Sequence, residues 1–582
     1  MNHAAREVAP LWGGRLLRLA TPVTLIYLGA TRATDPWRAL LPAAIWAIAA
    51  VGLGLLLGRG GQPMLCQAAF VAVGAYTYAW IAAPTPTGLG EQPITALGGA
   101  IVAVLLIALL TSPVLRVRGY VFALATIATG LLVHQGMRTG SWLPGANTGI
   151  LTVPDLSIGR WKLHSVESYV AASLVVLAVA ALAIQLRYDR GHRARELAEL
   201  AHDQDLAAEA GIDVVGLQRE LLLVGAGLAA VAGALYASAY GLVQPTTFGL
   251  QDSFLLAVAV LVGGRRSTLG AIAGAAALEL LGSALGNDLA DARVALMGVL
   301  LIAAIRWAPD GLIPPIRWRR PLRADHGLMT AGDLLDGGGA SLEVEDLVVE
   351  RAGVRALDRC SLEVAPSTVL AIVGPNGAGK TTLLHAIAGT VGARGRVRID
   401  GRDIGRRPPH RRARRGLART HQHLHPDPGA SVATIVEGGA DLHARATGRT
   451  SETGRRRRAA SALRILGIED LAERRVGTLT LAEQRLVDLA RLLAAGPRLA
   501  ILDEPVAGLD ARERATVLEF VRLLAHHGAT VIVVEHDLSF VQDLEARVVA
   551  LVDGRVLADG SASEVLSDPA VQVAYLGQEP VR

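Results

Sequence analysis

Long uncharged apolar runs in the first 310 residues constrain the fold of this chain more than any other feature. Ala39–Gly58 is uncharged over about twenty residues, which at 1.5 Å per residue is enough for a helix to cross about 30 Å of hydrocarbon. Similar runs are Ile94–Leu115, Tyr120–Val133, Ser168–Leu186 and Leu221–Gln251, the last long enough for more than one span. We therefore predict a polytopic α-helical membrane domain in this half of the chain.

Several shorter or glycine-rich apolar runs accompany them: Leu19–Thr31, Cys66–Ala83, Ser253–Gly264, Ser267–Leu278 and Val294–Ile305. Any one of these could equally be a buried core helix, but the set occurs in a chain that is 51% hydrophobic and 19% charged, with a mean hydropathy of +0.39. We expect about eight to ten spans, all before residue 310. The composition excludes a disordered or collagen-like chain, and two cysteines are too few for a disulfide framework.

Clusters of arginine predict which ends of the spans face the cytoplasm, because Lys and Arg accumulate on that side. One cluster lies within residues 187–195 and another within residues 306–323, after the last apolar run. Both therefore lie in the cytoplasm, and so does the sequence that follows the second. We divide the chain into a transmembrane domain at residues 1–323, a flexible glycine-containing linker at 324–340 and a cytoplasmic domain at 341–582.

Beyond the linker the pattern becomes that of a soluble α/β protein, in which short β-type runs alternate with helical patterns. The runs are Leu342–Val349, Val369–Val373, Leu499–Leu502, Thr530–Val534 and Val548–Val552. This alternation predicts a largely parallel sheet covered by helices.

One loop of this domain has the composition of a phosphate cradle. Gly374, Pro375, Asn376, Gly377, Ala378, Gly379, Lys380, Thr381 and Thr382 match G-x-x-x-x-G-K-[ST], between a predicted strand Thr368–Val373 and a predicted helix Thr382–Ala388. Gly377 and Gly379 let backbone N–H groups wrap the phosphates, and the helix N-terminus adds partial positive charge. Lys380 neutralises the outer phosphates, and the Thr381 hydroxyl is placed to ligate Mg²⁺.

Acidic residues follow a second apolar strand. Leu499–Leu502 ends in Asp503 and Glu504, so beside a phosphate loop Asp503 can hold the metal through water and Glu504 can polarise an attacking water. His536 follows the strand Thr530–Val534 and Glu535; a single His there is more often structural, but its position after a parallel strand favours a γ-phosphate sensor.

Taken together, these residues resemble the nucleotide-binding domain of an ATP-binding cassette (ABC) transporter over residues 342–578. The order of the phosphate loop, Gln422, a signature segment, Asp503-Glu504-Pro505, Ala507-Gly-Leu-Asp510 and His536 is that family's order. The segment Gly416–Gln422 and the tail, from Gly554 to Gly577, look specifically like the ATPases of branched-chain amino-acid importers.

The membrane half is similar to the permease of the same importers, over residues 40–315. The matching motifs are Gln67–Thr77, Leu115–Gly119, Pro144–Ile150, Ala207–Ile212, Gly233–Tyr236 and Leu261–Gly264. The resemblance implies a fused permease–ATPase subunit of an ABC importer, in which ATP binding closes two nucleotide domains. The loop Arg187–Glu220 would then be the mechanical joint, with the helix-like stretch Arg195–Ala210 lying in a groove of the ATPase.

The resemblance also implies site residues, cofactors and partners. Gln422 would take part in hydrolysis and link Mg²⁺ to the permease contact, and Arg351 stands where the family has an aromatic residue that stacks on adenine. ATP and Mg²⁺ are the implied cofactors, and the plasma (inner) membrane is the implied location. The partners are a second permease subunit, a second ATPase subunit, an extracytoplasmic solute-binding protein and membrane lipid, but no nucleic acid.

The signature departs from the family's Leu-Ser-Gly-Gly-Gln, because Thr480, Leu481, Ala482 and Glu483 follow Leu479. Glycines there let backbone N–H groups approach the γ-phosphate of the opposite ATPase, so Cβ atoms and an added carboxylate would weaken that contact. We therefore predict a heterodimer in which the partner ATPase supplies an intact signature.

The function predicted from the sequence is ATP-driven import of branched-chain or related amino acids. Urea or short amides remain open as substrates, because related permeases take them. A membrane-anchored regulatory ATPase also remains open because of the altered signature. An ABC exporter is disfavoured by the number of spans and the short joint loop, and a soluble ATPase acting on nucleic acid is excluded by the membrane half.

Overall fold

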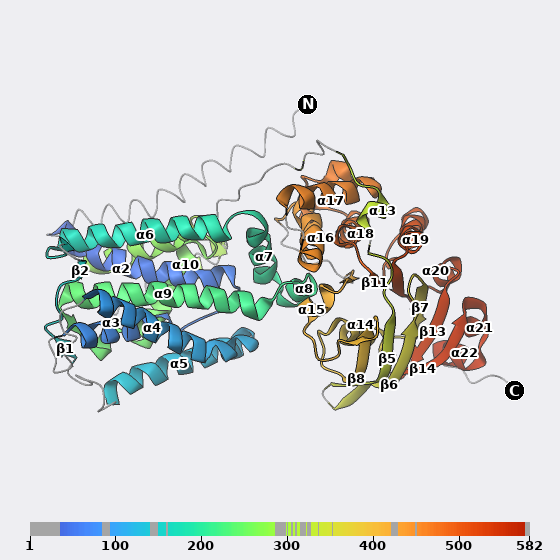
Figure 1. Cartoon of the computed structure of the whole chain (residues 1–582), viewed down its shortest axis with the longest axis horizontal. Helices are drawn as coiled ribbons and strands as arrows, with labels where there is room; N and C mark the ends of the chain where they lie inside the picture. The colour runs from blue at the N-terminus through green and yellow to red at the C-terminus, as the bar shows by residue number, and fades with distance from the viewer. Residues whose placement is uncertain are drawn as a thin grey trace. The chain divides into compact units, whose positions relative to one another are not determined.

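The computed structural model divides into two compact units, which are described separately (Figure 1). The first comprises Met1–Arg193 with Val215–Trp318, and the second comprises Ala194–Val214 with Arg319–Arg582. The structure describes residues 35–83, 93–139, 149–158, 161–285, 298–299, 301–303, 306–308, 311–314, 322, 327–335, 337–351, 353–420, 429–448 and 451–576.

The first unit is a bundle of apolar helices. They are α2 (Pro36–Gly54), α3 (Gln67–Ala82), α4 (Pro93–Thr111), α5 (Gly119–Thr139), α6 (Val166–Tyr188), α9 (Val214–Tyr240), α10 (Leu250–Gly264) and α11 (Thr268–Leu285). Within the described residues, six segments are long and apolar enough to span a membrane, and Thr268–Ser283 is a shorter apolar helix. Short strands lie between them: β1 (Ile150–Leu151) pairs with β4 (Leu242–Val243), and β2 (Ser157–Ile158) with β3 (Trp161–Lys162).

The predicted apolar runs correspond to these helices, with one correction. Leu221–Gln251 forms a single span, because α9 ends at Tyr240 and the chain then passes through β4 and a turn before α10. Gly241, which has a positive φ, and Pro245 lie in this connection, and both interrupt a helix. The run Leu19–Thr31 and most of Val294–Ile305 lie outside the described residues.

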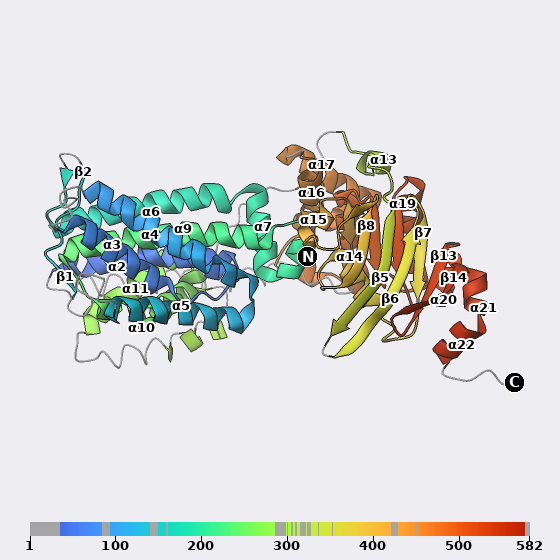
Figure 2. The ribbon, with the colours of Figure 1, turned by 60° about the horizontal axis from the view of Figure 1, so that its bottom comes forward.

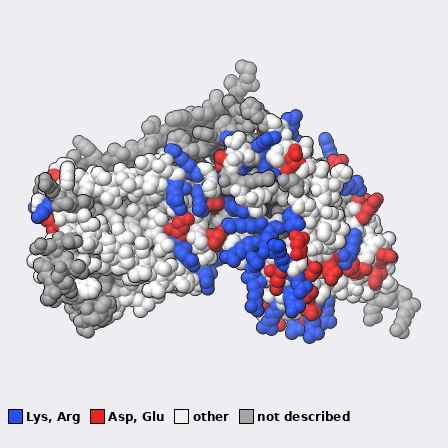
Figure 3. Space-filling view, in the orientation of Figure 1, with Lys and Arg blue, Asp and Glu red and all other residues white. Residues whose placement is uncertain are grey.

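Charge in the first unit is concentrated at the ends of helices. Arg59, which is buried, donates from Nε and Nη2 to the Asp189 carboxylate at 2.9 Å and from Nη2 to Thr268 Oγ1 at 2.9 Å. This network ties the ends of α2, α6 and α11 together. On the face shown in Figure 3, the described surface between the ends of this bundle is largely uncharged, as expected for helices that face lipid.

The second unit contains a six-stranded sheet with the order β10-β11-β12-β7-β13-β14. These strands are β7 (Val369–Val373), β10 (Leu417–Arg419), β11 (Leu499–Asp503), β12 (Thr530–Val534), β13 (Arg547–Val552) and β14 (Arg555–Ser561). All neighbours are parallel except β13 and β14. These pairings confirm the predicted, largely parallel sheet. Its apolar strands β7, β11 and β12 are buried on both faces, as is usual for parallel strands.

A second, four-stranded antiparallel sheet has the order β6-β5-β8-β9. Its strands are β5 (Leu342–Arg351), β6 (Val354–Val364), β8 (Arg394–Ile399) and β9 (Arg402–Asp403). The run Leu342–Val349, which we grouped with the parallel strands, therefore belongs to this antiparallel sheet. The alternation of apolar and charged residues in Leu342-Glu-Val-Glu345 carries this information, since one face packs on the core and the other is solvated.

Helices surround the two sheets (Figures 1 and 2). Those of the second unit are α13 (Ala331–Leu334), α14 (Lys380–Ala388), α15 (Pro409–Ala413), α16 (Val432–Thr447), α17 (Glu452–Ile465), α18 (Leu481–Ala495), α19 (Ala511–His526), α20 (Leu538–Asp543), α21 (Ala562–Ser567) and α22 (Pro569–Leu576), in addition to the helices of its segment Ala194–Val214. In both views α16 and α17 lie at one side of the unit, and α21 and α22 lie at the other. Helices α16, α17 and α18 share one apolar core with β11 and β12.

The described part of the predicted flexible linker is packed. Leu334 and Leu335 are buried in the core of the second unit, Met329 N donates to Ser461 Oγ at 2.9 Å, and Ala340 N donates to Arg498 O at 3.2 Å. The glycine content of residues 324–340 therefore predicted a flexible linker, whereas the described part of it packs on the rest of the second unit. The two leucines are the signal for packing, because each buries apolar surface.

Candidate functional site

The phosphate loop joins β7 to α14. Gly374, Gly377 and Gly379 have φ values of +156°, +86° and +99°. A Cβ on Gly379 would lie 2.5 Å from Ala356 O, whereas one on Gly377 would meet nothing within 4 Å. Gly379 is therefore required by close packing, and Gly377 only by its backbone conformation. The loop leads directly into the N-terminus of α14, where backbone N–H groups favour an anion.

Lys380 bridges the loop. Its Nζ donates to Gly374 O at 2.6 Å and to Pro375 O at 3.0 Å, so the ammonium group lies over the loop rather than in solvent. Burial lowers the pKa of Lys380, and the carboxylates of Glu504, Asp503 and Glu535 oppose that shift. This places one cation where the outer phosphates of a nucleotide would need it.

Tyr575 of α22 also contacts the loop, although we assigned it no role from the sequence. Gly374 N donates to its hydroxyl at 2.5 Å, across 201 residues of sequence. The tail that resembles branched-chain importers thus touches the first residue of the phosphate loop.

Asp503 ends β11 and is fully buried. Its Oδ2 accepts from Arg419 Nη2 at 2.7 Å, and its backbone N donates to Thr420 Oγ1 at 3.1 Å. Its Oδ1 has no hydrogen-bond partner among the described residues. A buried carboxylate oxygen without a donor is costly unless a ligand completes it, so this oxygen fits a water-coordinated Mg²⁺.

Glu504 follows with a φ of +46°, which lies in the left-handed region that non-glycine residues rarely occupy. Its backbone N donates to Val534 O at 2.9 Å, so the pairing with β12 holds this conformation. Strained backbone of this kind concentrates at functional sites because it directs a side chain to where it is needed.

Glu535 is a further buried carboxylate beside these residues, and sequence reasoning missed it. It accepts from Val506 N at 3.0 Å and from His536 N at 3.2 Å, so it organises the turn after Glu504 and the backbone before His536. Burial raises its pKa. The His536 ring is exposed and available to a ligand, with its Nδ1 3.8 Å from Glu535 Oε2.

Two predicted site residues are not placed by the structure. Gln422 lies outside the described residues, and of Arg351 only the backbone, at the end of β5, is described. Thr381 and Thr382 lie in the first turn of α14, next to Lys380.

The side chains of the signature segment form hydrogen bonds within the segment and with the neighbouring Arg474. Thr480 caps α18: its Oγ1 accepts from Glu483 N at 3.2 Å, and Glu483 Oε2 accepts from Thr480 N at 2.7 Å. Arg474 Nη1 donates to the other carboxylate oxygen at 2.9 Å. The bond from Thr480 N holds the pKa of Glu483 below its usual range, so a negative charge occupies the anion-binding end of this helix.

The segment Ala194–Val214, which we call the joint segment, belongs to the second unit. It contains α8 (Gln204–Glu209) and most of α7 (Gly191–His202). Arg195 donates to Asp441 at 2.8 Å, to Glu437 at 2.9 Å and to Glu452 at 3.0 Å, so one guanidinium joins α16 and α17.

The far end of the joint segment is held through its backbone carbonyls. Arg445 Nη1 donates to Ala210 O at 2.6 Å, and Arg414 Nε donates to Gly211 O at 3.0 Å. Between these ends, Glu199 has its Oε2 shielded from solvent without a hydrogen-bond partner among the described residues. Burial raises the pKa of Glu199 to about 7. The segment is thus fixed at both ends to the rest of the second unit.

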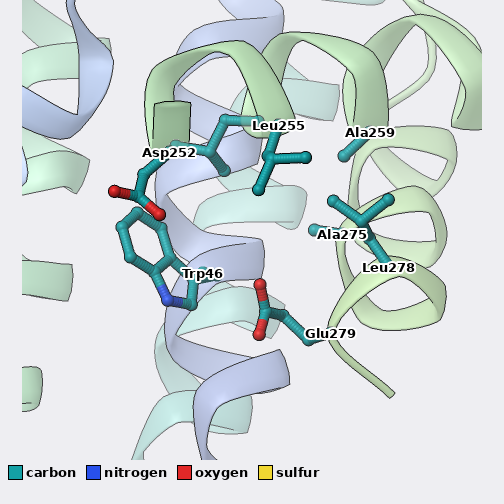
Figure 4. Close-up of a pocket in the computed structure, with 8 residues that line it drawn as sticks. Trp46, Asp252, Leu255, Ala259, Ala275, Leu278 and Glu279 are labelled. Carbon is teal, nitrogen blue, oxygen red and sulfur yellow. The ribbon is translucent and has the colours of Figure 1, made fainter. Parts of the chain in front are cut away.

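The first unit contains a pocket between α2, α10 and α11 (Figure 4). Its lining combines the Trp46 indole, the carboxylates of Asp252 and Glu279, and apolar side chains. In the figure the two carboxylates lie on opposite sides of the indole. No local sequence pattern predicts this pocket, because Trp46 lies within one apolar run, whereas Asp252 and Glu279 lie beside two others.

Comparison with known protein families agrees with this geometry. The model "Branched-chain amino acid transport system / permease component" matches residues 37–305, the ABC transporter model matches residues 357–507, and the model "Branched-chain amino acid ATP-binding cassette transporter" matches residues 555–580. The chain belongs to the branched-chain amino-acid ABC transporter family. The predicted resemblance is confirmed for both halves, and the cytoplasmic half of this ABC transporter chain is an ATP-hydrolysing cassette.

Characterised relatives align with the ATPase half of this ABC transporter. The branched-chain amino acid transport ATP-binding protein BraF of Pseudomonas aeruginosa is 32% identical over 249 residues, covering 41% of this chain and 98% of BraF. LivG of Salmonella typhimurium, of the same description, is 30% identical over 41% of this chain and 98% of its own length. The hemin import protein HmuV of Rhodopseudomonas palustris is 35% identical, over 39% of this chain and 85% of HmuV. A crystal structure of a nucleotide-free ABC transporter cassette covers 41% of this chain and all of its own, at 27% identity and a TM-score of 0.37.

Proposed function

We propose that this chain is the fused permease and ATPase subunit of an importer for branched-chain or related amino acids in the plasma (inner) membrane. The observation that carries the proposal is the union, in one chain, of a branched-chain permease match at residues 37–305 and a branched-chain ATPase match at 555–580. The domain boundaries proposed from the sequence, 1–323, 324–340 and 341–582, remain part of this proposal.

The substrate class rests on the membrane half. The ATPase half does not decide it, since a hemin import protein is as similar there as the branched-chain proteins are. The permease match at residues 37–305 carries the description of a branched-chain amino-acid transport system, and this is the observation that favours an amino acid over urea or a short amide.

The proposed chemistry is hydrolysis of ATP by positioned charges. Residues Gly374 to Thr382 bind the phosphates, with Lys380 as the cation over the loop. Thr381, Asp503 and Gln422 would hold Mg²⁺, which neutralises charge on the phosphates when bound. The residues with further roles are Glu504, which polarises water, His536, which contacts the γ-phosphate, and Arg351, which stacks on adenine.

Coupling to transport follows from the joint segment. Arg195, Arg414 and Arg445 hold it against the ATPase, so that movement of one is transmitted to the other. Because the segment is continuous with α6 and α9, such movement reaches the membrane helices through the chain itself.

The self-capped signature supports a heteromeric complex. In the family the signature of one ATPase completes the active site of the other, and here the Glu483 carboxylate occupies the helix end where a γ-phosphate would bind. A partner ATPase with an intact signature would give one competent site and one weakened site. Two copies of this chain would be weak at both.

Affinity purification of the tagged chain from native membranes in mild detergent, with mass spectrometry of the bound proteins, tests this proposal. We expect a second permease, a second ATPase and an extracytoplasmic solute-binding protein, whose bound solute identifies the substrate. Recovery of this chain alone, hydrolysing ATP at ordinary transporter rates in a manner abolished by Glu504→Gln, would refute the heteromer. An ATPase without solute-binding partners would favour the membrane-anchored regulatory ATPase.

A further inference from the structure

A buried arginine stands between the joint segment and the proposed metal site. Arg419, at the end of β10, is 4% exposed and donates from Nη2 to Asp503 Oδ2 at 2.7 Å. Its Nη1 lies 3.7 Å from Oε1 of Glu209, the last residue of α8 in the joint segment. Asp503 is fully buried and Glu209 is 8% exposed. One guanidinium therefore faces two shielded carboxylates from distant parts of the chain.

The backbone of Arg419 is fixed while its side chain has a choice of partner. Arg491 Nη2 donates to Arg419 O at 2.6 Å, and β10 pairs with β11 in register, so the Cα position is set by the sheet. Arg419 Nη1 also lies 3.3 Å from His385 Nδ1, whereas Arg419 Nε and Asp503 Oδ1 have no partner among the described residues. The guanidinium can therefore move closer to either carboxylate, Asp503 or Glu209, without a change in its backbone.

We propose that Arg419 is a positioning residue that links metal binding at Asp503 to the seating of the joint segment through Glu209. The inference rests on the proposed role of Asp503 in holding Mg²⁺. With a divalent cation bound beside Asp503, the Arg419 guanidinium would be repelled and would lose part of its attraction to the Asp503 carboxylate. Arg419 then pairs more strongly with Glu209, which tightens the joint segment on the ATPase.

The coupling acts in both directions, as thermodynamic linkage requires. When Glu209 moves away, the guanidinium has Asp503 as its remaining carboxylate and competes with Mg²⁺ for it. An unseated joint segment therefore lowers the affinity of the ATPase for its metal. A conformation of the membrane half that unseats the joint segment would in this way disfavour metal binding.

A titration of Mg²⁺ with a fluorescent ATP analogue, on the full chain in lipid nanodiscs, tests the inference by binding rather than by turnover. Glu209→Gln is nearly isosteric and removes the carboxylate that competes for Arg419. We therefore expect the Mg²⁺ midpoint, the Mg²⁺ concentration that gives half-maximal binding of the ATP analogue, to rise about fivefold or more. Fivefold is the lower end of typical couplings between sites. Arg419→Gln removes the competitor and should lower the midpoint. The double variant should match Arg419→Gln alone, because Glu209 acts through Arg419.

Asp559→Asn is the matched control, because it makes the same change of charge at an exposed pair with Arg547, away from the site. It should leave the midpoint unchanged. Hydrogen exchange of residues 204–214 gives a second readout: Mg²⁺ with nucleotide should increase their protection in the wild-type chain and not in Arg419→Gln.

The inference is wrong if Glu209→Gln and Asp559→Asn give the same midpoint, or if the effects of the Glu209 and Arg419 changes add independently. If Arg419→Gln does not fold, the comparison of Glu209→Gln with its control still decides the matter. If nucleotide binding by the wild-type chain does not depend on Mg²⁺ at all, the proposed metal role of Asp503 fails instead, together with the inference that rests on it.

Discussion

Replacing Arg195 by alanine should impair transport without impairing nucleotide binding. The side chain is 11% exposed and makes ion pairs of 2.8, 2.9 and 3.0 Å with Asp441, Glu437 and Glu452. Removing one partner from a buried ion pair costs about 3–5 kcal/mol. Arg455 lies 3.2 Å from Asp441 and will offset part of the loss.

We therefore expect seating of the joint segment to weaken by about 2–3 kcal/mol, or roughly 30- to 150-fold in its equilibrium constant. Transport by the reconstituted complex should fall at least about tenfold, while nucleotide binding at the phosphate loop, measured at saturating Mg²⁺, stays unchanged. Both are measured in the same proteoliposome preparation, as solute uptake and as binding of a fluorescent nucleotide.

Arg187→Ala is the control, because its pair with Glu220 involves a side chain that is 61% exposed. Such surface pairs contribute about 0–1 kcal/mol, so transport should change little. Arg195→Lys keeps the charge but loses the bidentate bond to Asp441. Its transport rate should lie between those of the wild-type chain and Arg195→Ala. The reasoning is refuted if Arg195→Ala transports at the wild-type rate, or if Arg187→Ala is equally impaired.

Three further substitutions test other parts of the site. Glu504→Gln should reduce ATP hydrolysis by about 10²- to 10⁴-fold without loss of nucleotide binding, as single-turnover and binding assays would reveal. Tyr575→Phe removes the acceptor for Gly374 N and should weaken nucleotide binding by about 1 kcal/mol, or roughly fivefold, in a filter-binding titration. The raised pKa of Glu199, about 7, means that stability linked to its protonation is present below its ordinary pKa of about 4.5 and is lost as pH rises through about 7. Between pH 5 and pH 8 this linkage amounts to about 3 kcal/mol, so melting curves should show Glu199→Gln gaining about 5–10 °C on the wild-type chain; parallel pH profiles would contradict this.

Local patterns were enough to predict the phosphate loop and four strands of the six-stranded sheet, β7, β11, β12 and β13, but not its edge strands β10 and β14. The run Thr530–Val534 has the same bounds as the strand β12, because its five consecutive apolar or β-branched residues are all buried and the residues on either side, Ala529 and Glu535, are of types depleted in strands. The cap on the signature helix was also readable, since Thr480 followed three residues later by Glu483 is a capping-box pattern. We interpreted Glu483 as a lost glutamine that adds negative charge, and did not predict its role in the cap.

Other features could not be read from local pattern. The pairing of Arg419 with Asp503 joins residues 84 positions apart, and that of Arg195 with Asp441 joins residues 246 apart. No periodicity marks such partners; they meet only because the parallel sheet aligns β10 with β11 and because the joint segment packs on α16. Trp46, Asp252 and Glu279 meet for the same reason, through the packing of α2, α10 and α11.

The most direct test of the central claim is ATP-driven uptake by the purified native complex in sealed vesicles, with the solute-binding protein supplied outside. We predict uptake of a branched-chain amino acid that requires ATP inside the vesicle, is lost in Glu504→Gln and is not competed by excess urea. ATP hydrolysis without uptake of any amino acid, or uptake competed by urea, would contradict the account.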